Sequence, residues 1–131
     1  MDISVAGIAV QDGKLFVARR AEGGDMGGKW EFPGGKVEDG ETCEQALVRE
    51  FLEEFGAGAD VRGQLAEAEF ENKGRRRLLK AFEVKLFSRN FTLSEHTEWR
   101  WADCDEIEAM DFTPSDMKLL AGIKRHLESE K

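Results

Sequence analysis

Carboxylates at helical spacing stand out in the middle of the chain. Residues 49–56 read REFLEEFG, which places Glu50, Glu53 and Glu54 at positions i, i+3 and i+4. Residues at this spacing share one face of a helix, and their like charges repel one another unless a cation lies between them. Hard divalent cations take oxygen ligands, and Mg²⁺ is the usual ion where phosphate is also bound. The spacing indicates a magnesium site, although a merely solvated acidic face is the common alternative for this pattern alone.

A helix over residues 42–55 is predicted to position these carboxylates. Apolar residues recur at i, i+4 and i+8 on the side opposite the carboxylates, namely Leu47, Val48, Phe51, Leu52 and Phe55. Gly56 follows, where the end of a helix favours a residue that tolerates positive φ. The Pro-Gly-Gly sequence at residues 33–35 predicts a turn whose backbone can approach a ligand closely.

Two charged residues flank the carboxylates on this helix. Glu41 precedes its first turn and adds a further acid to the group, with a capping residue or one that interacts with the helix dipole as the alternative. Arg49 is predicted to pair with a neighbouring Glu. Such a pair holds a carboxylate in the rotamer that binds a metal, as residues behind a metal site commonly do.

The segment over residues 35–57 resembles the Nudix box. That box is a glycine, five residues, Glu, seven residues, Arg-Glu, an apolar residue, any residue, Glu-Glu, any residue, a glycine and an apolar residue. All of its fixed positions are filled here, by Gly35, Glu41, Arg49, Glu50, Phe51, Glu53, Glu54, Gly56 and Ala57. The aromatic ring of Phe51 and the small Ala57 are departures of packing only. The resemblance implies one α/β domain over residues 1–131, an α/β/α sandwich with a mixed sheet that hydrolyses nucleoside diphosphates linked to another group.

The resemblance also implies roles for individual residues. Glu50, Glu53 and Glu54 would coordinate Mg²⁺, or Mn²⁺ in its place, with the Gly35 carbonyl as a further ligand. Lys36 would face the phosphates. The general base would be Glu50 or an acid from the loop that holds Glu95 and Glu98, and the sequence does not choose between them.

Three further segments resemble the MutT-type subgroup of the family, ARR at residues 18–20, KWEFPGGKVE at residues 29–38 and FTPSD at residues 112–116. That subgroup cleaves nucleoside triphosphates to a nucleoside monophosphate and pyrophosphate, often from oxidised nucleotides such as 8-oxo-dGTP, and so links nucleotide-pool sanitising to DNA repair. By position, Arg20 would contact phosphate and Arg76 would lie at the rim of the base pocket. Phe32, Phe70 and Leu78 would wall that pocket, with core packing as an equal alternative.

Asp116 is the departure from the subgroup that matters most. MutT carries an Asn at this place, and an amide both donates and accepts, whereas an ionised carboxylate only accepts. Asp116 would therefore favour amino groups such as cytosine N4 or guanine N1 and N2, and would oppose a bare O6 unless protonated. Both 8-oxo-dGTP and cytosine nucleotides stay open as substrates. The alternative for Asp116 is a cap of the last helix.

Other functions are less favoured by the sequence. Resemblance to ADP-ribose hydrolases would predict a proline after the box, and to dinucleoside polyphosphate hydrolases a tyrosine. The chain has no tyrosine, and its prolines are Pro33 and Pro114. A non-catalytic, nucleotide-sensing Nudix module usually loses box carboxylates, which are all present here. The basic run at residues 75–77 beside Lys73 is short, so a solvated turn with one substrate-facing arginine is favoured over nucleic-acid binding.

The remaining elements follow from alternating and helical patterns. Strands are predicted over residues 3–10, 14–18, 30–32, 60–71, 76–88 and 98–102, with hairpin turns at residues 11–13 and 72–75, and a last helix over residues 115–127. The loop over residues 20–29 joins the second and third strands. His96 is predicted to lie in a loop, and Trp99 and Trp101 in the core.

Composition sets the outer limits. The chain is 40% hydrophobic and 35% charged with a net charge of −8, and no apolar run is long enough to span a bilayer. A negative chain needs divalent cations to bind a phosphate ester. Cys43 and Cys104 are expected to be free thiols. With no signal-peptide pattern at the N-terminus, we expect a cytoplasmic monomer or homodimer that contacts neither membrane nor nucleic acid.

Overall fold

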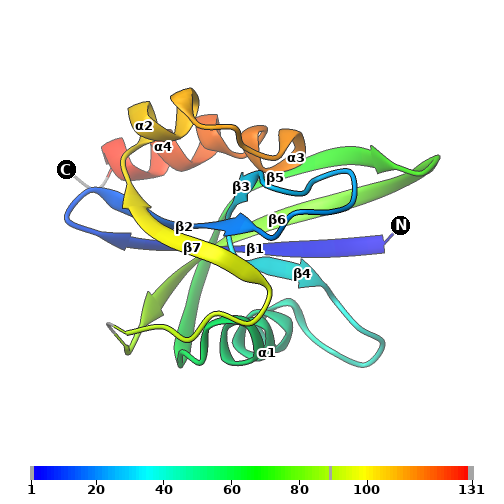
Figure 1. Ribbon diagram of the computed structural model, residues 1–131, viewed down its shortest axis with the longest axis horizontal. Helices are drawn as coiled ribbons and strands as arrows, with labels where there is room; N and C mark the ends of the chain where they lie inside the picture. The colour runs from blue at the N-terminus through cyan, green and yellow to red at the C-terminus, as the bar shows by residue number, and fades with distance from the viewer. Residues whose placement is uncertain (1, 89, 130–131) are drawn as a thin grey trace.

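A mixed β-sheet separates two helical layers in the computed structural model, which describes residues 2–88 and 90–129 (Figure 1). Helix α1 covers one face, and α2, α3 and α4 cover the other (Figure 1). The elements in chain order are β1 (Asp2–Gln11), β2 (Lys14–Arg20), β3 (Trp30–Glu31), β4 (Gly34–Lys36), α1 (Cys43–Phe55), β5 (Ala59–Asn72), β6 (Arg75–Leu86), β7 (His96–Ala102), α2 (Cys104–Ala109), α3 (Pro114–Met117) and α4 (Leu120–Ser129). The predicted α/β/α sandwich is confirmed.

Strand β1 is the centre of the sheet. Among the described residues the sheet has 7 strands in the order β3-β2-β1-β6-β5, with β4 added to β1 and β7 added to β2. β1 runs parallel to β6 and antiparallel to β2 and β4. β4 can approach β1 only because residue 34 is a glycine: a Cβ there would lie 1.9 Å from the carbonyl oxygen of Val5.

The alternation of side chains along the strands creates two cores. On β1, Ala6 and Ile8 face the layer of α2, α3 and α4, whereas Val5 and Ala9 face α1. The core beneath α1 is rich in aromatic rings, and Phe16 packs edge-on against Phe55 with ring centroids 5.3 Å apart. The core beneath α1 fixes this helix on the sheet, and α1 carries the predicted metal ligands.

Helix α1 begins and ends as the sequence predicts, but its faces differ from the prediction. Thr42 caps its N-terminus in a capping box with Gln45, and Gly56 ends it with φ of 63°. Leu52, predicted on the apolar face, is 54% exposed, whereas Glu54 is only 8% exposed. The arc of apolar residues is therefore narrower than predicted, and one carboxylate lies at the border of the core.

Two other predictions about elements were wrong, and one helix was missed. The predicted turn at residues 33–35 forms a strand instead, because Gly34 and Gly35 pair with β1. The last helix is two helices, since α3 ends at Met117 and α4 begins at Leu120. Helix α2 was not predicted, although the spacing of Asp103 and Glu106 in the sequence is that of a capping box, which they form in the structure.

Two further observations complete the fold. Within the described part of the chain, no helix is long and apolar enough to cross a membrane. Cys43 and Cys104 are free thiols, as predicted.

Candidate active site

Arg49 organises the acidic face of α1. Its Nε lies 2.8 Å from Glu41 Oε2, and its Nη1 lies 2.9 Å from Glu50 Oε1 and 3.4 Å from Glu53 Oε2. Its Nη2 donates to the carbonyl oxygen of Lys36 at 3.1 Å. The predicted pairing of Arg49 with neighbouring glutamates is present, and it ties the helix to the end of β4.

Glu41 serves this network and not the helix terminus. Thr42 is the N-cap, and Glu41 accepts from the backbone N–H of Glu38 at 3.0 Å while pairing with Arg49. The hydrogen bond from Arg49, followed by the one from Glu38, lowers the pKa of Glu41 to about 2. The capping interpretation of Glu41 was therefore wrong.

Glu54 has an unusual environment for a carboxylate. Its Oε2 atom is buried and has no hydrogen-bond partner among the described residues. Burial raises the pKa of Glu54 to about 9, and the carboxylates of Glu50, Glu95 and Glu31 add to this rise. Acids from α1, β3 and the loop before β7 thus converge on Glu54, and no basic side chain is among the groups that shift its pKa.

Glu95 and Glu98, the two acids near the start of β7, have different neighbours. Glu95 is among the carboxylates that act on Glu54. Glu98 lies within β7 and pairs with Arg19, with 3.2 Å between Glu98 Oε1 and Arg19 Nη1. The structure thus brings Glu95, and not Glu98, to the converging acids.

These residues fit a divalent cation. All their side-chain donors are carboxylate oxygens, one of them is buried without a partner, and positive charge would relieve their repulsion. Gly35 packs so closely on Glu50 that a Cβ would lie 2.6 Å from its Oε1, so the Gly35 backbone adjoins that carboxylate. In residues 2–88 and 90–129 no group of three or more acidic, cysteine or histidine side chains is arranged to hold a metal ion, and Glu53 is turned toward Arg49 with 60% of its side chain exposed.

A cavity of about 730 Å³ adjoins the carboxylates on the side of β3, β4 and α3. Gly35 and Glu31 lie where the two meet. The predicted substrate-binding residues that line the cavity are Arg20, Phe32, Phe70 and Asp116. Phe32 also packs in the core, 5.0 Å from the ring of Phe112, so its core and pocket interpretations are both satisfied.

Three predicted substrate-binding residues do not line this cavity. Leu79 lines it in place of Leu78, because consecutive residues of β6 point to opposite faces of the sheet. Arg76 is exposed and pairs with Glu69. The side chain of Lys36 is outside the lining, and its carbonyl oxygen accepts from Arg49.

Asp116 faces the cavity and does not cap a helix. Thr113 occupies the N-cap position of α3, and Asp116 Oδ2 accepts from the backbone N–H of Phe32 at 2.9 Å. Burial, followed by the charge of Glu31, raises the pKa of Asp116 to about 7. The carboxyl group can therefore change from a donor to an acceptor close to neutral pH.

Two residues that sequence analysis did not place in the site belong to its architecture. Glu31 lines the cavity from β3. His96, predicted as a loop residue, is buried at the first position of β7, and its Nε2 lies 2.9 Å from Glu31 Oε2. A polar residue between Trp30 and Phe32 in a short apolar strand was the available signal for Glu31.

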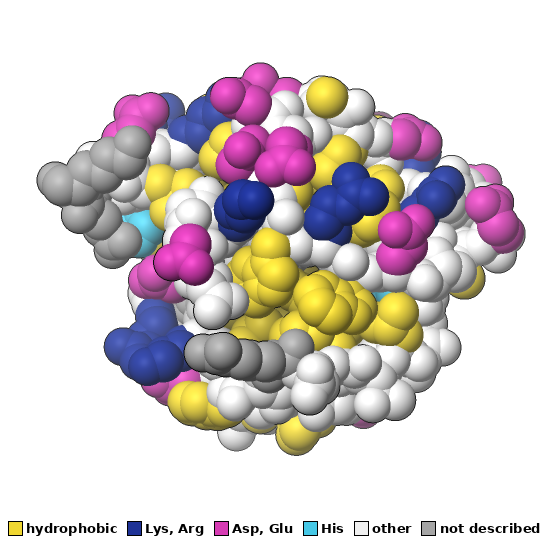
Figure 2. All heavy atoms as spheres, turned by 60° about the vertical axis from the view of Figure 1, so that its left-hand side comes forward, with side chains coloured by type: hydrophobic (Ala, Val, Ile, Leu, Met, Phe, Trp, Pro, Cys, Tyr) yellow, Lys and Arg dark blue, Asp and Glu magenta, His cyan; other side chains and the backbone are white. Residues whose placement is uncertain are grey.

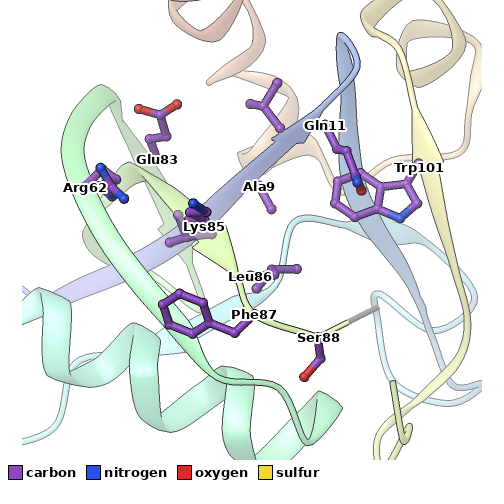
Figure 3. A pocket seen from close by; sticks show the side chains of 11 residues that line it. Ala9, Gln11, Arg62, Glu83, Lys85, Leu86, Phe87, Ser88 and Trp101 are labelled. Carbon is purple, nitrogen blue, oxygen red and sulfur yellow. The ribbon is translucent and has the colours of Figure 1, made fainter. Parts of the chain in front are cut away.

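A second cavity, of about 540 Å³, lies at the other end of β1. Figure 3 shows Phe87 and Trp101 on two sides of it, with Lys85 and Gln11 nearby. Figure 2 shows hydrophobic side chains gathered on one face, and Phe87, with 69% of its surface exposed, and Trp99 are among the large exposed apolar residues. The prediction that Trp99 packs in the core holds in part: its ring packs against Phe16 and Phe91, but the residue is 37% exposed.

Comparison with known proteins identifies the class. Residues 1–123 match the model of the NUDIX domain. The chain therefore belongs to the Nudix family, as its box and fold indicate.

Similar proteins place it among the MutT-type Nudix hydrolases. The CTP pyrophosphohydrolase of Escherichia coli strain K12 is 40% identical over 116 residues, which cover 88% of this chain and 86% of that protein. The 8-oxo-dGTP diphosphatase of the same strain is 34% identical over 125 residues, covering 95% and 97%. The predicted subgroup is thereby confirmed.

Solved structures agree with this placement. The solution structure of the E. coli ORF135 protein is 38% identical with a TM-score of 0.86, and covers 95% of this chain and 89% of that one. The crystal structure of the MutT protein from Methanosarcina mazei Go1 is 26% identical with a TM-score of 0.83, covering 99% and 95%. Nudix hydrolases generally use divalent metal ions, which agrees with the converging acids described above.

Proposed function

We propose that this protein is a magnesium-dependent nucleoside triphosphate pyrophosphohydrolase that sanitises the nucleotide pool. The observation that carries the proposal is the convergence of Glu50, Glu54 and Glu95 beside a cavity that Phe32 and Asp116 line. One end offers oxygen ligands for a metal and the other offers an aromatic wall with one hydrogen-bonding carboxyl. This arrangement suits a ligand with phosphates at one end and a base at the other.

The metal ligands in this proposal are Glu50, Glu53, Glu54 and the carbonyl of Gly35. When bound there, Mg²⁺ or Mn²⁺ supplies charge neutralisation for the phosphates and a lowered pKa for the attacking water. Arg49 holds Glu50 and Glu53 by the contacts described above. Glu53 must turn from its exposed position to join the other two, and the ion pair with Arg49 limits how far it can turn.

The chemical step is hydrolysis at the β-phosphorus. The water oxygen forms a bond to the β-phosphorus, and the bond between that phosphorus and the α–β bridging oxygen breaks. The products are the nucleoside monophosphate, which keeps the bridging oxygen, and pyrophosphate. Glu50 or Glu95 takes the proton of the water. Glu95 is the less restrained of the two, because Glu50 already accepts from Arg49 at 2.9 Å.

The base is recognised at the far end of the cavity. Phe32 and Phe70 provide apolar contact, and Asp116 is the polar group that reads the edge of the base. Ionised Asp116 accepts from amino groups such as cytosine N4, whereas protonated Asp116 can donate to a guanine O6. Two relatives named for CTP and for 8-oxo-dGTP represent these two outcomes. We propose both nucleotide classes as substrates, with cytosine nucleotides favoured as pH rises above neutral.

The proposed substrate also accounts for the predicted location, because free nucleotides are a cytoplasmic pool. A monomer or homodimer remains the predicted assembly. Neither property enters the chemistry of the site.

The test is pyrophosphate release from a panel of compounds, each with and without Mg²⁺. The panel holds normal and oxidised nucleoside triphosphates, ADP-ribose and diadenosine polyphosphates. Magnesium-dependent pyrophosphate release from triphosphates supports the proposal. Release of other products from ADP-ribose or diadenosine polyphosphates alone would assign a different Nudix substrate, and binding without turnover across the panel would assign a nucleotide-sensing module.

A further inference from the structure

Glu31 lies between the two ends of the proposed substrate site. It lines the cavity, and its charge acts both on Glu54 at the carboxylate end and on Asp116 at the base end. Its side chain is 15% exposed. A carboxylate placed between two acids is repelled by both, so something must hold it in position.

Two donors hold Glu31 from outside the cavity's acids. His96 Nε2 lies 2.9 Å from Glu31 Oε2, and Arg20 Nη1 lies 3.2 Å from Glu31 Oε1. Each carboxylate oxygen therefore has its own donor. Because a carboxylate accepts, Nε2 of His96 donates the proton of its hydrogen bond.

His96 is itself held rigidly. Its side chain is 2% exposed and its ring stacks on Phe55, with ring centroids 5.0 Å apart and an interplanar angle of 23°. Its Nδ1 is buried without a hydrogen-bond partner among the described residues. A buried polar atom without a partner costs stability, so the position is not one that packing alone would select for a histidine.

We propose that His96 is a positioning residue that, with Arg20, fixes the Glu31 carboxylate against the substrate cavity. The inference rests on the proposed function, because the cavity must be where the substrate binds. Both residues hold Glu31, but Arg20 is partly exposed, whereas His96 is buried at the start of β7. The fold therefore fixes the position of His96 more firmly than that of Arg20. Without His96, Glu31 would lose the donor that holds its Oε2, and only the partly exposed Arg20 would keep it in place.

The first experiment compares two amides at one position. In His96→Gln the amide nitrogen falls close to the place of Nε2 and can still donate to Glu31, whereas in His96→Asn it falls close to the place of Nδ1. We expect His96→Asn to lower kcat for triphosphate hydrolysis by about tenfold to a hundredfold, the size of a lost hydrogen bond to a charged group. His96→Gln should retain most of the activity. Equal activity of the two variants would overturn the proposal.

A double-mutant cycle with Glu31→Gln separates positioning from folding. If His96 acts through Glu31, adding His96→Asn to Glu31→Gln lowers kcat by less than about threefold, because the group to be positioned is already changed. If His96→Asn lowers kcat by the same factor with and without Glu31→Gln, the proposal is overturned and His96 serves packing. Thermal unfolding of each variant reports packing directly, and His126→Gln on α4 is the matched control for replacing a histidine.

The cycle also distinguishes this inference from the proposed function. A wild-type protein that releases no pyrophosphate from the panel overturns both the proposed function and this inference. An active wild-type protein with additive losses overturns the role of His96 alone.

Discussion

Two cavities of this protein lie at opposite ends of the same strand, β1. Ser4 and Val5 on β1 line the cavity beside the carboxylates, and Ala9, Val10 and Gln11 line the other. The volumes are comparable, about 730 Å³ and about 540 Å³. They differ in how their charges are compensated.

Charged groups in the second cavity face solvent or partners of opposite sign. Arg62 pairs with Asp60 at 2.9 Å, and Glu83 lies 3.8 Å from His126. In the first cavity, Glu31 lies near Asp116 and also near Glu54, which adjoins the cavity, and burial raises the pKa values of both Asp116 and Glu54. Buried acids with raised pKa values that lie close to other carboxylates, and not the size of the cavity, mark the candidate active site.

The largest expected effect comes from the metal ligands. Glu53→Gln should lower kcat by at least about a hundredfold, since even residues behind a metal site cost ten- to a hundredfold when changed. Glu53 is exposed, so the fold should be unchanged, and circular dichroism with thermal unfolding checks this. Turnover near that of the wild type would remove Glu53 from the metal site.

The next effect tests the residue that holds the carboxylates. Arg49→Lys keeps the positive charge but cannot reach Glu41, Glu50 and the Lys36 carbonyl together, because the planar guanidinium supplies several donors in a fixed geometry. We expect kcat to fall by about tenfold to a hundredfold and the apparent affinity for Mg²⁺ to weaken. Magnesium titrations of activity measure both, and an unchanged Mg²⁺ dependence would show that Arg49 contributes only to the fold.

A smaller effect should appear in base preference. With a pKa of about 7, Asp116 carries a proton at lower pH and loses it as pH rises. The ratio of kcat/KM for CTP to that for 8-oxo-dGTP should therefore rise by about tenfold from pH 6 to pH 8, since one good hydrogen-bonded base contact discriminates by about 1–3 kcal/mol. Using a ratio cancels changes in the metal site that affect both substrates.

Asp116→Asn is the matched control for that ratio. An amide does not titrate, so the ratio should become independent of pH and shift toward 8-oxo-dGTP.

The same replacement bears on stability. Because the folded pKa of Asp116 is raised, its contribution to stability is fully present below an unfolded pKa of about 4 and is lost as pH rises to about 7. The unfolding temperature of the wild type, relative to that of Asp116→Asn, should therefore fall as pH rises across that window. A ratio of kcat/KM values that varies with pH in both proteins would exclude Asp116 as the titrating group.

The smallest effect is expected at the second cavity. Phe87 is exposed there and contacts none of the converging acids, so Phe87→Ser should change kcat/KM by less than about twofold and should improve solubility. Pyrophosphate release and light scattering measure the two outcomes. A loss of activity comparable with that of Arg49→Lys would show that the two cavities are coupled, and the contrast between them would fail.

Local chemistry made much of the fold readable from the sequence. Turn and cap residues affect only the few residues next to them, so their effect is visible in the sequence. Examples are the hairpin turns, the N-cap Thr42 and the C-cap Gly56. The predicted single helix over residues 115–127 failed because packing against β5 and the sheet, and not periodicity, decided where α3 ends and α4 begins. The strand at Gly34 depends likewise on a partner, β1, that is distant in sequence.

The sequence by itself determined the family, the order of the main elements and the residues of the box, because a helix fixes the spacing of Glu50, Glu53 and Glu54 through its own geometry. Only the tertiary structure decided which of these is buried, that Glu95 and not Glu98 joins them, and that Leu79 and not Leu78 faces the cavity. It also decided that His96 reaches Glu31, across 65 positions of the chain. Burial, charge repulsion and contact between distant segments depend on where the strands bring side chains together, and no local pattern contains that information.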